Sequence, residues 1–228
     1  HESSEFRQAA DFQTDNLSGM STADFGIYTE SPSEINNPEN LRVIEQFSEW
    51  LRQQPEVDHV TTLSDTMKRL NKNMHNDDEG KYVLPDNQEL AAQYLLLFEM
   101  SLPYGLDLNN QLDIDKSATR IMVTMQNLGS NEFVAFEQRA YAHFDQLAPD
   151  LRLTAASPPL MFAHIGETDM KSMIEGTLLA LVLISGLLIL ALRSVRMGII
   201  SLIPNMLPAG LGFGIWAVIS AEINMALA

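Results

Sequence analysis

Oxygen-bearing side chains of the types that bind calcium recur between residues 107 and 115. The candidate ligands among them are Asp107, Asn109, Asp113 and Asp115. A calcium loop of the helix–loop–helix type needs a glycine at its sixth position and a glutamate at its twelfth, and the spacing here does not fit that pattern. We therefore expect these residues to be solvated acids of a loop.

Other sequence features that would indicate a metal, a cofactor or an enzyme are absent. The chain has no cysteine, and its internal histidines (His59, His75, His143 and His164) form no His-x-x-x-His pair. This argues against a disulfide scaffold and a zinc site. The sequence also lacks a Gly-x-Ser-x-Gly, phosphate-loop or dinucleotide-binding motif. We expect no enzyme, no cofactor and no metal.

Polar and helix-bending residues lie together in the C-terminal part, at Pro204, Asn205 and Pro208. One interpretation is that these are prolines of an ordinary membrane helix, whose neighbours compensate for the bend. The other is a kinked, closely packed helix in which the Asn205 amide forms a hydrogen bond to an adjacent helix. The three residues are our candidates for helix packing or transport.

Two long uncharged segments surround these residues. The segment 176–192 has 17 residues, of which 11 are Leu, Ile or Val, and the segment 197–221 has 25 residues. A bilayer requires about 20 apolar residues in a helix, with a range of about 17 to 25. We therefore predict membrane helices over about 174–192 and 197–221, and the start of a further helix at 223–228.

The short loop between the two helices carries Arg193 and Arg196. Basic residues in short loops favour the cytoplasmic side, so both are topology determinants. This places the 193–196 loop in the cytoplasm and residues 1–170 in the periplasm of a multi-pass inner-membrane protein. The first residues do not resemble a signal peptide, so we also expect an earlier membrane helix and regard the chain as a fragment.

The charge is divided unevenly between the two parts. The formal net charge is −16, but only Glu175 and Glu222 among the 30 acidic residues lie after residue 170. We therefore predict a water-soluble domain at 1–170 and a membrane region at 171–228. The acidic balance argues against nucleic acid as a partner, because phosphate backbones are bound by clustered Lys and Arg.

The soluble part contains two segments with a strand–helix–strand pattern, at about 24–63 and 119–156. In each, alternating apolar residues precede a helical pattern, which we expect to be capped by Asn37 in the first and Asn131 in the second. Between them, 64–118 is an insertion with a helix at about 87–100 and polar loops. The pattern predicts an α+β domain with a duplicated βαβ, ferredoxin-like arrangement, followed by an all-α transmembrane helical hairpin.

Three features of the C-terminal part occur together: the apolar segment from Gly176, the Arg-Ser turn at Arg193 and the Pro-Asn-x-x-Pro segment from Pro204. They resemble the second and third membrane helices of the resistance-nodulation-division (RND) superfamily, specifically of its MMPL-like predicted exporters. The segments 89–97 and 102–107 resemble its periplasmic loop.

The resemblance implies a periplasmic porter domain and an inner-membrane exporter of hydrophobic or amphiphilic, lipid-like molecules, driven by the proton motive force. The implied partners are the lipid bilayer, a lipid-like substrate, the remaining transmembrane helices, and a homo-oligomer or a periplasmic accessory protein. The proton-carrying acids of the family lie in a later helix, beyond Ala228. The alternative function is a membrane-anchored extracytoplasmic binding, sensor or translocation-accessory protein without transport.

Overall fold

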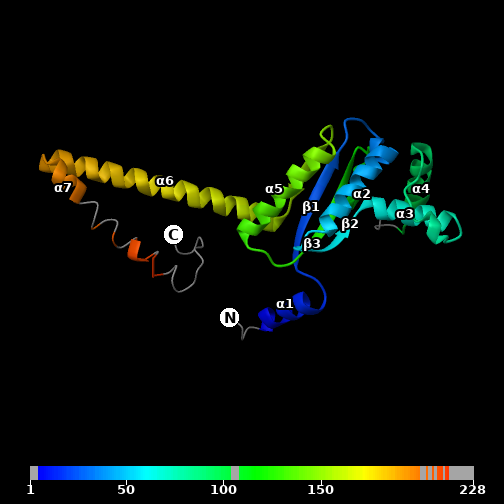
Figure 1. Cartoon of the computed structure of the whole chain (residues 1–228), viewed down its shortest axis with the longest axis horizontal. Coiled ribbons are helices and arrows are strands. Elements are labelled where there is room, and N and C mark those ends of the chain that lie inside the picture. Colours follow the sequence, from blue (N-terminus) through cyan, green and yellow to red (C-terminus); the bar gives the residue numbers. More distant parts are fainter. Residues whose placement is uncertain are drawn as a thin grey trace. The chain divides into compact units, whose positions relative to one another are not determined.

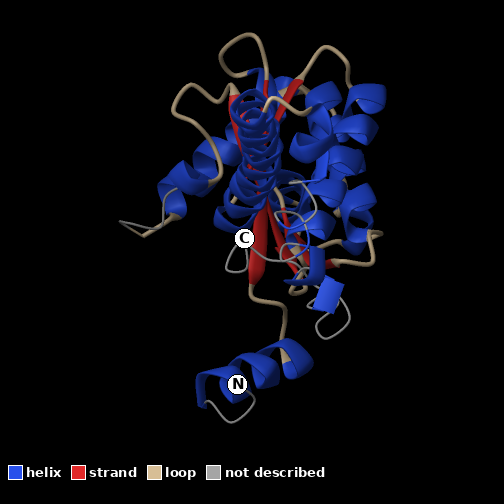
Figure 2. Cartoon of the chain, turned by 90° about the vertical axis from the view of Figure 1, so that its left-hand side faces the viewer, coloured by secondary structure: helices blue, strands red, loops and turns tan. Residues whose placement is uncertain are grey.

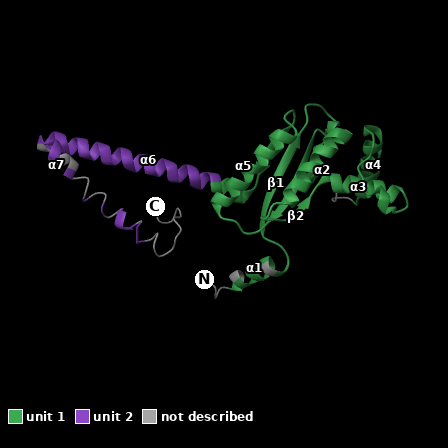
Figure 3. Cartoon of the chain, in the orientation of Figure 1, with its two compact units in different colours: residues 1–163 green, residues 164–228 purple. Residues whose placement is uncertain are grey.

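The computed structural model of the chain describes residues 5–103 and 108–200, and then positions 204, 207, 210–212, 214 and 215. The structure is mixed α+β, with one four-stranded antiparallel sheet and one long apolar helix (Figure 1). The chain divides into unit 1, His1–Ala163, and unit 2, His164–Ala228 (Figure 3). The boundary between them lies within the long helix.

The sheet belongs to unit 1, and its strands are not in sequence order. The strands are β1 (Ser21–Tyr28), β2 (Val57–Thr61), β3 (Ala118–Met125) and β4 (Arg152–Ala156). Their spatial order is β2-β3-β1-β4, and all three pairings are antiparallel. The first strand of each strand–helix–strand segment, β1 and β3, therefore lies at the centre of the sheet, and the second lies at an edge.

Figure 2 distinguishes the strands of the sheet from the helices by colour. The α-helices are α1 (Glu5–Asn16), α2 (Pro38–Arg52), α3 (Leu63–Met74), α4 (Gln88–Ser101), α5 (Ser130–Leu147), α6 (Pro158–Leu192) and α7 (Val195–Ile200). Three short 3₁₀ turns complete the described structure: η1 (Glu34–Asn36), η2 (Glu79–Lys81) and η3 (Leu108–Asn110).

The insertion between the two strand–helix–strand segments contains more helix than its sequence led us to expect. The predicted helix at 87–100 corresponds to α4, but α3 was not predicted, and the strand that we extended to Leu63 ends at Thr61. Leu63, Met67 and Leu70 recur at helical spacing on the buried face of α3. The polar residues between these positions obscured that pattern.

One of the two predicted helix caps is correct. The Asn37 side chain accepts a hydrogen bond from the Glu39 amide at 3.0 Å and begins α2. The prediction for Asn131 is wrong, because α5 begins at Ser130 with Gly129 as its N-cap. There the Glu132 carboxylate reaches back and accepts a hydrogen bond from the Gly129 amide at 2.8 Å. This contact satisfies an otherwise unpaired N–H at the helix start.

Helices α2 and α5 cover the same face of the sheet. The Phe25 ring of β1 lies 5.7 Å from Phe47 of α2 and 6.0 Å from Phe136 of α5, measured between ring centroids. Phe144 of α5 meets Phe47 edge-on at 5.1 Å. All four rings are essentially inaccessible to solvent. The aromatic contacts therefore join both helices to the central strand in one core.

A network of charges ties α3 to α2. Lys68 of α3 is largely buried, with its Nζ 2.9 Å from Glu45 Oε1 and 3.4 Å from Asp65 Oδ1. Arg52 of α2 forms a further ion pair with Asp65. Burial lowers the pKa of Lys68, but the hydrogen bond and charge of Glu45, assisted by Asp65, outweigh it and raise the pKa above its ordinary value. Lys68 therefore remains charged at neutral pH.

The edge strand β4 has one of its outward backbone groups covered. The Ala155 amide donates a hydrogen bond of 2.8 Å to the hydroxyl oxygen of Tyr141, which comes from α5. Since this N–H pairs with a side chain, it does not pair with the neighbouring strand β1. A helix side chain therefore occupies a position at the sheet edge where another strand could bind.

Helix α6 begins in unit 1 and continues through unit 2. Leu160 and Ala163 are buried in the core of unit 1. With 35 residues, α6 is about 52 Å long at 1.5 Å per residue. Among the described residues, it is the one helix long and apolar enough to cross a membrane, and only 6% of its most apolar window is buried. Its apolar surface is therefore exposed.

Candidate functional site

The connection after α6 is shorter than predicted. Helix α6 ends at Leu192 and α7 begins at Val195, so Arg193 and Ser194 alone connect them, and Arg196 lies in the first turn of α7. Arg193 has a φ of 48°, a left-handed conformation that commonly ends a helix. Both arginine side chains are exposed.

The three candidates for helix packing fall mostly outside the described residues. Pro204 is helical and exposed, whereas Asn205 and Pro208 lie outside the described residues. The same is true of most of the predicted helix at 197–221, of which α7 and a few further helical positions are described, and of the segment 223–228. The two interpretations of this helix therefore remain open.

In the acidic loop that contains the calcium-type residues, the Asp113 side chain has a structural role. Its carboxylate accepts hydrogen bonds from the Ser117 amide at 2.7 Å, the Ala118 amide at 2.8 Å and the Ser117 hydroxyl at 2.6 Å. Burial raises the pKa of Asp113, but these hydrogen bonds outweigh it and hold the pKa below its ordinary value. Asp115 is exposed, and Asp107 lies outside the described residues. The described part of the chain contains no group of side chains that could hold a metal ion.

The histidines lie on separate elements. His59 is in β2, His75 follows α3, His143 is in α5 and His164 is in α6. The His143 ring stacks on Trp50 of α2, with centroids 4.5 Å apart and planes 9° from parallel. Burial lowers the pKa of His143. This histidine is therefore part of the contact between the two helices that cover the sheet.

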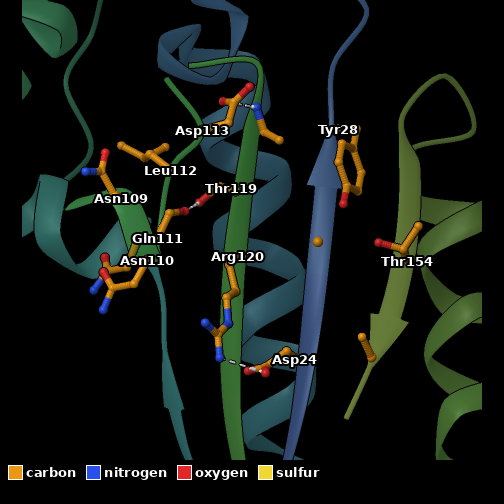
Figure 4. Close-up of a pocket in the computed structure, with 13 residues that line it drawn as sticks. Asp24, Tyr28, Asn109, Asn110, Gln111, Leu112, Asp113, Thr119, Arg120 and Thr154 are labelled. Atoms are coloured by element: carbon orange, nitrogen blue, oxygen red, sulfur yellow. Dashed lines mark hydrogen bonds and ion pairs between the residues drawn. The ribbon is translucent and has the colours of Figure 1, made fainter. Parts of the chain in front are cut away.

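The described part of unit 1 contains a pocket that the sequence did not indicate. It lies on the sheet face opposite α2 and α5, and we call it the open-face groove (Figure 4). Its volume is about 390 Å³. Its floor comes from β3, β1 and β4, and one wall comes from the segment around η3. This wall is held against β3 by a hydrogen bond of 2.8 Å from the Arg120 amide to the Gln111 carbonyl.

Strand register brings the floor residues of the groove together. Gly26 of β1 lies directly opposite Arg120 of β3 on one side and Thr154 of β4 on the other. The Arg120 guanidinium reaches along the sheet and donates a hydrogen bond of 2.8 Å to Asp24. Tyr28 lies next on the same face of β1, with the Arg152 guanidinium carbon 4.3 Å from its ring centroid. Polar groups from three strands therefore surround a position that has no side chain.

The signal for this groove was present in β1 but was ambiguous. Ala23, Phe25 and Ile27 alternate as the buried face, which leaves Asp24 and Tyr28 on the other face. A strand with one apolar and one polar face is typical of any half-exposed sheet. Only the pairing with strands about 90 and 130 residues away shows which polar side chains meet.

In comparisons with known proteins, no family model and no curated protein matches the chain.

Proposed function

We propose that the chain is part of an inner-membrane exporter of hydrophobic or amphiphilic molecules, driven by the proton motive force and similar to the MMPL-like members of the RND superfamily. The observation that carries this proposal is the exposed apolar surface of α6, in the same helix whose first turns pack into an α+β domain. Such a surface is costly in water and stable in lipid.

The architecture of unit 1 supports the porter-domain part of the proposal. Its elements β1-α2-β2 and β3-α5-β4 repeat one pattern, and the sheet order β2-β3-β1-β4 is that of a split βαβ fold. We propose that unit 1 is a duplicated, ferredoxin-like porter domain in the periplasm, with α3 and α4 as its insertion. Superposition of the two halves tests this: the paired strands and helices should coincide, apart from the insertion.

The orientation in the membrane rests on Arg193 and Arg196. These 228 residues contain no cysteine, so single cysteines can be introduced at Ser31, an exposed loop residue of unit 1, and at Ser194, in a full-length protein from which any other cysteines have been removed. In spheroplasts of cells that produce the full-length protein, an impermeant thiol reagent should label Ser31→Cys directly. It should label Ser194→Cys only after the membrane is opened. Equal labelling of both from outside contradicts the proposed orientation.

Proton coupling requires ionisable groups that this segment does not provide. Between residues 176 and 221 the sequence has two ionisable residues, Arg193 and Arg196, and both lie in or beside the loop. Acids inside a membrane are the usual proton carriers, and the resemblance puts them outside this chain. Export by the full-length protein should therefore collapse when a protonophore is added. Asn205→Leu should impair export without reducing membrane insertion if its amide bridges to the proton-carrying helix.

A membrane-anchored binding or sensor protein is the second candidate, and the open-face groove favours it. A groove with polar groups can bind a ligand without any transport. The two functions differ in a measurable way. Ligand-dependent export that stops with a protonophore supports the exporter, whereas ligand binding without export of any hydrophobic probe supports the sensor.

A further inference from the structure

Gly26 lies in the floor of the open-face groove, beneath the side chains of Thr154 and Tyr28. A Cβ atom at Gly26 would lie 3.0 Å from Thr154 Oγ1 and 3.1 Å from Tyr28 Oη. Contacts this short force the neighbouring side chains to move. Glycine therefore lets the Thr154 hydroxyl and the Tyr28 ring edge lie close over the strand at the floor of the groove (Figure 4).

Several hydrogen-bonding groups in the groove have unused capacity. Within the part of the chain that the structure describes, the hydroxyls of Tyr28 and Thr154 and the side-chain amide of Asn110 form no hydrogen bond. The Tyr28 and Thr154 side chains are partly exposed, so their hydroxyls can donate hydrogen bonds to a ligand and accept them from it.

The charged groups that line the groove already have partners. Asp24 and Arg120 lie 2.8 Å apart and form an ion pair. The Asp113 carboxylate accepts hydrogen bonds from the amides of Ser117 and Ala118 and from the Ser117 hydroxyl. A phosphate or carboxylate ligand would compete with Asp24 for the guanidinium, and a cation would compete with Arg120 for the carboxylate. Hydroxyl groups can instead accept from Arg120 and donate to Asp24 without breaking the pair. The groove therefore favours an uncharged ligand with several hydroxyls.

We propose that the open-face groove binds an uncharged, hydroxyl-rich group, such as a sugar ring or another polyol. In this site ligand hydroxyls pair with the hydroxyls of Tyr28 and Thr154, and a further one bridges Asp24 and Arg120. The site lies wholly within unit 1, and the proposal does not depend on export.

The test uses the full chain in phosphatidylcholine nanodiscs, whose lipid carries no sugar. Saturation-transfer NMR measures the binding of maltose, glucose and glucose 6-phosphate. The variants are Thr154→Val and Tyr28→Phe, each of which removes one hydroxyl from the groove. The matched control is Thr124→Val, on the same sheet face of β3 but outside the groove.

We expect saturable binding of maltose and glucose to the wild-type chain and to Thr124→Val, and weaker binding of glucose 6-phosphate. Thr154→Val and Tyr28→Phe should each bind maltose at least tenfold more weakly, with an unchanged circular dichroism spectrum. If Thr154→Val does not fold, Tyr28→Phe alone decides. No saturable signal from either sugar, tighter binding of glucose 6-phosphate than of glucose, or an equal loss in Thr124→Val overturns the proposal.

Discussion

Truncation of Phe144 to alanine tests whether α5 packs on α2 as described. The Phe144 side chain is fully buried and meets the Phe47 ring edge-on at 5.1 Å. Truncation removes its burial from water and leaves a cavity, which for a large aromatic residue costs about 3 to 5 kcal/mol. The edge-on ring pair adds about 0.5 to 1.5 kcal/mol beyond burial, so we expect a loss in the upper half of that range.

The assay takes advantage of the position of Trp50. This residue stacks on Phe47 with ring centroids 6.0 Å apart, and the chain has only one other tryptophan, Trp216. In a Trp216→Phe background the fluorescence therefore reports the aromatic cluster of unit 1. Urea titration in detergent gives the free energy of unfolding. For a unit of this size a loss of about 4 to 5 kcal/mol should lower the melting temperature by about 8 to 20 °C, at about 2 to 4 °C per kcal/mol.

A matched control is Phe12→Ala in α1, where the ring is 64% exposed. Its free energy of unfolding should change by less than about 0.5 kcal/mol, as for most surface substitutions. If Phe144→Ala loses less than about 1 kcal/mol, in the same range as Phe12→Ala, then Phe144 does not lie in the core. The joint packing of α2 and α5 on the sheet would then be incorrect.

Three further predictions concern single residues. The depressed pKa of His143 means that the folded state resists protonation, so stability is complete above the unfolded pKa near 6.5 and falls as the pH drops below it. Unfolding by urea at pH 7.5 and 5.0 should show a larger loss for the wild type than for His143→Gln, and an equal loss would contradict the assignment. Gly19→Ala should destabilise unit 1 by about 2 kcal/mol or more, since its Cβ would lie 1.9 Å from the Met125 carbonyl oxygen; an unchanged melting temperature would refute that contact. Asn37→Ala should cost about 1 kcal/mol by loss of the α2 cap, measured by the same titration, whereas Asn37→Asp should retain most of the stability.

The elements that local patterns specify could be predicted from the sequence, and those that depend on pairing could not. The alternation that begins at residues 24 and 119 and the Asn37-Pro38 start of α2 are local signals that a single sequence contains, although β1 begins three residues earlier than predicted, at Ser21. The start of α5 was predicted two residues too late because both Gly129 and Asn131 can act as an N-cap. The structure uses Gly129, whose amide donates a hydrogen bond to the Glu132 carboxylate. Helix α3 was missed because its apolar positions are few.

The open-face groove could not be predicted because it depends on strand register. Asp24 and Arg120 are 96 residues apart in the chain, and they meet only because β1 lies beside β3 in one register. A shift of one residue would move Arg120 into the core face and remove the groove. The exposed apolar surface of α6, by contrast, follows from its composition alone, so the sequence predicts a membrane segment there directly.

The hydrogen bond between the Ala155 amide and the Tyr141 hydroxyl affects whether two copies of the chain can associate through their sheet edges. A free edge strand is a template onto which a second copy can add a strand, and this danger is greatest at high concentration and during synthesis. Here the tyrosine of α5 holds one of the outward amides of β4. Strand addition at that position must first displace this hydroxyl, so edge pairing is slowed as long as α5 stays docked. Protection of this edge from aggregation is therefore acquired together with helix packing, and a chain in which α5 has not yet docked lacks it.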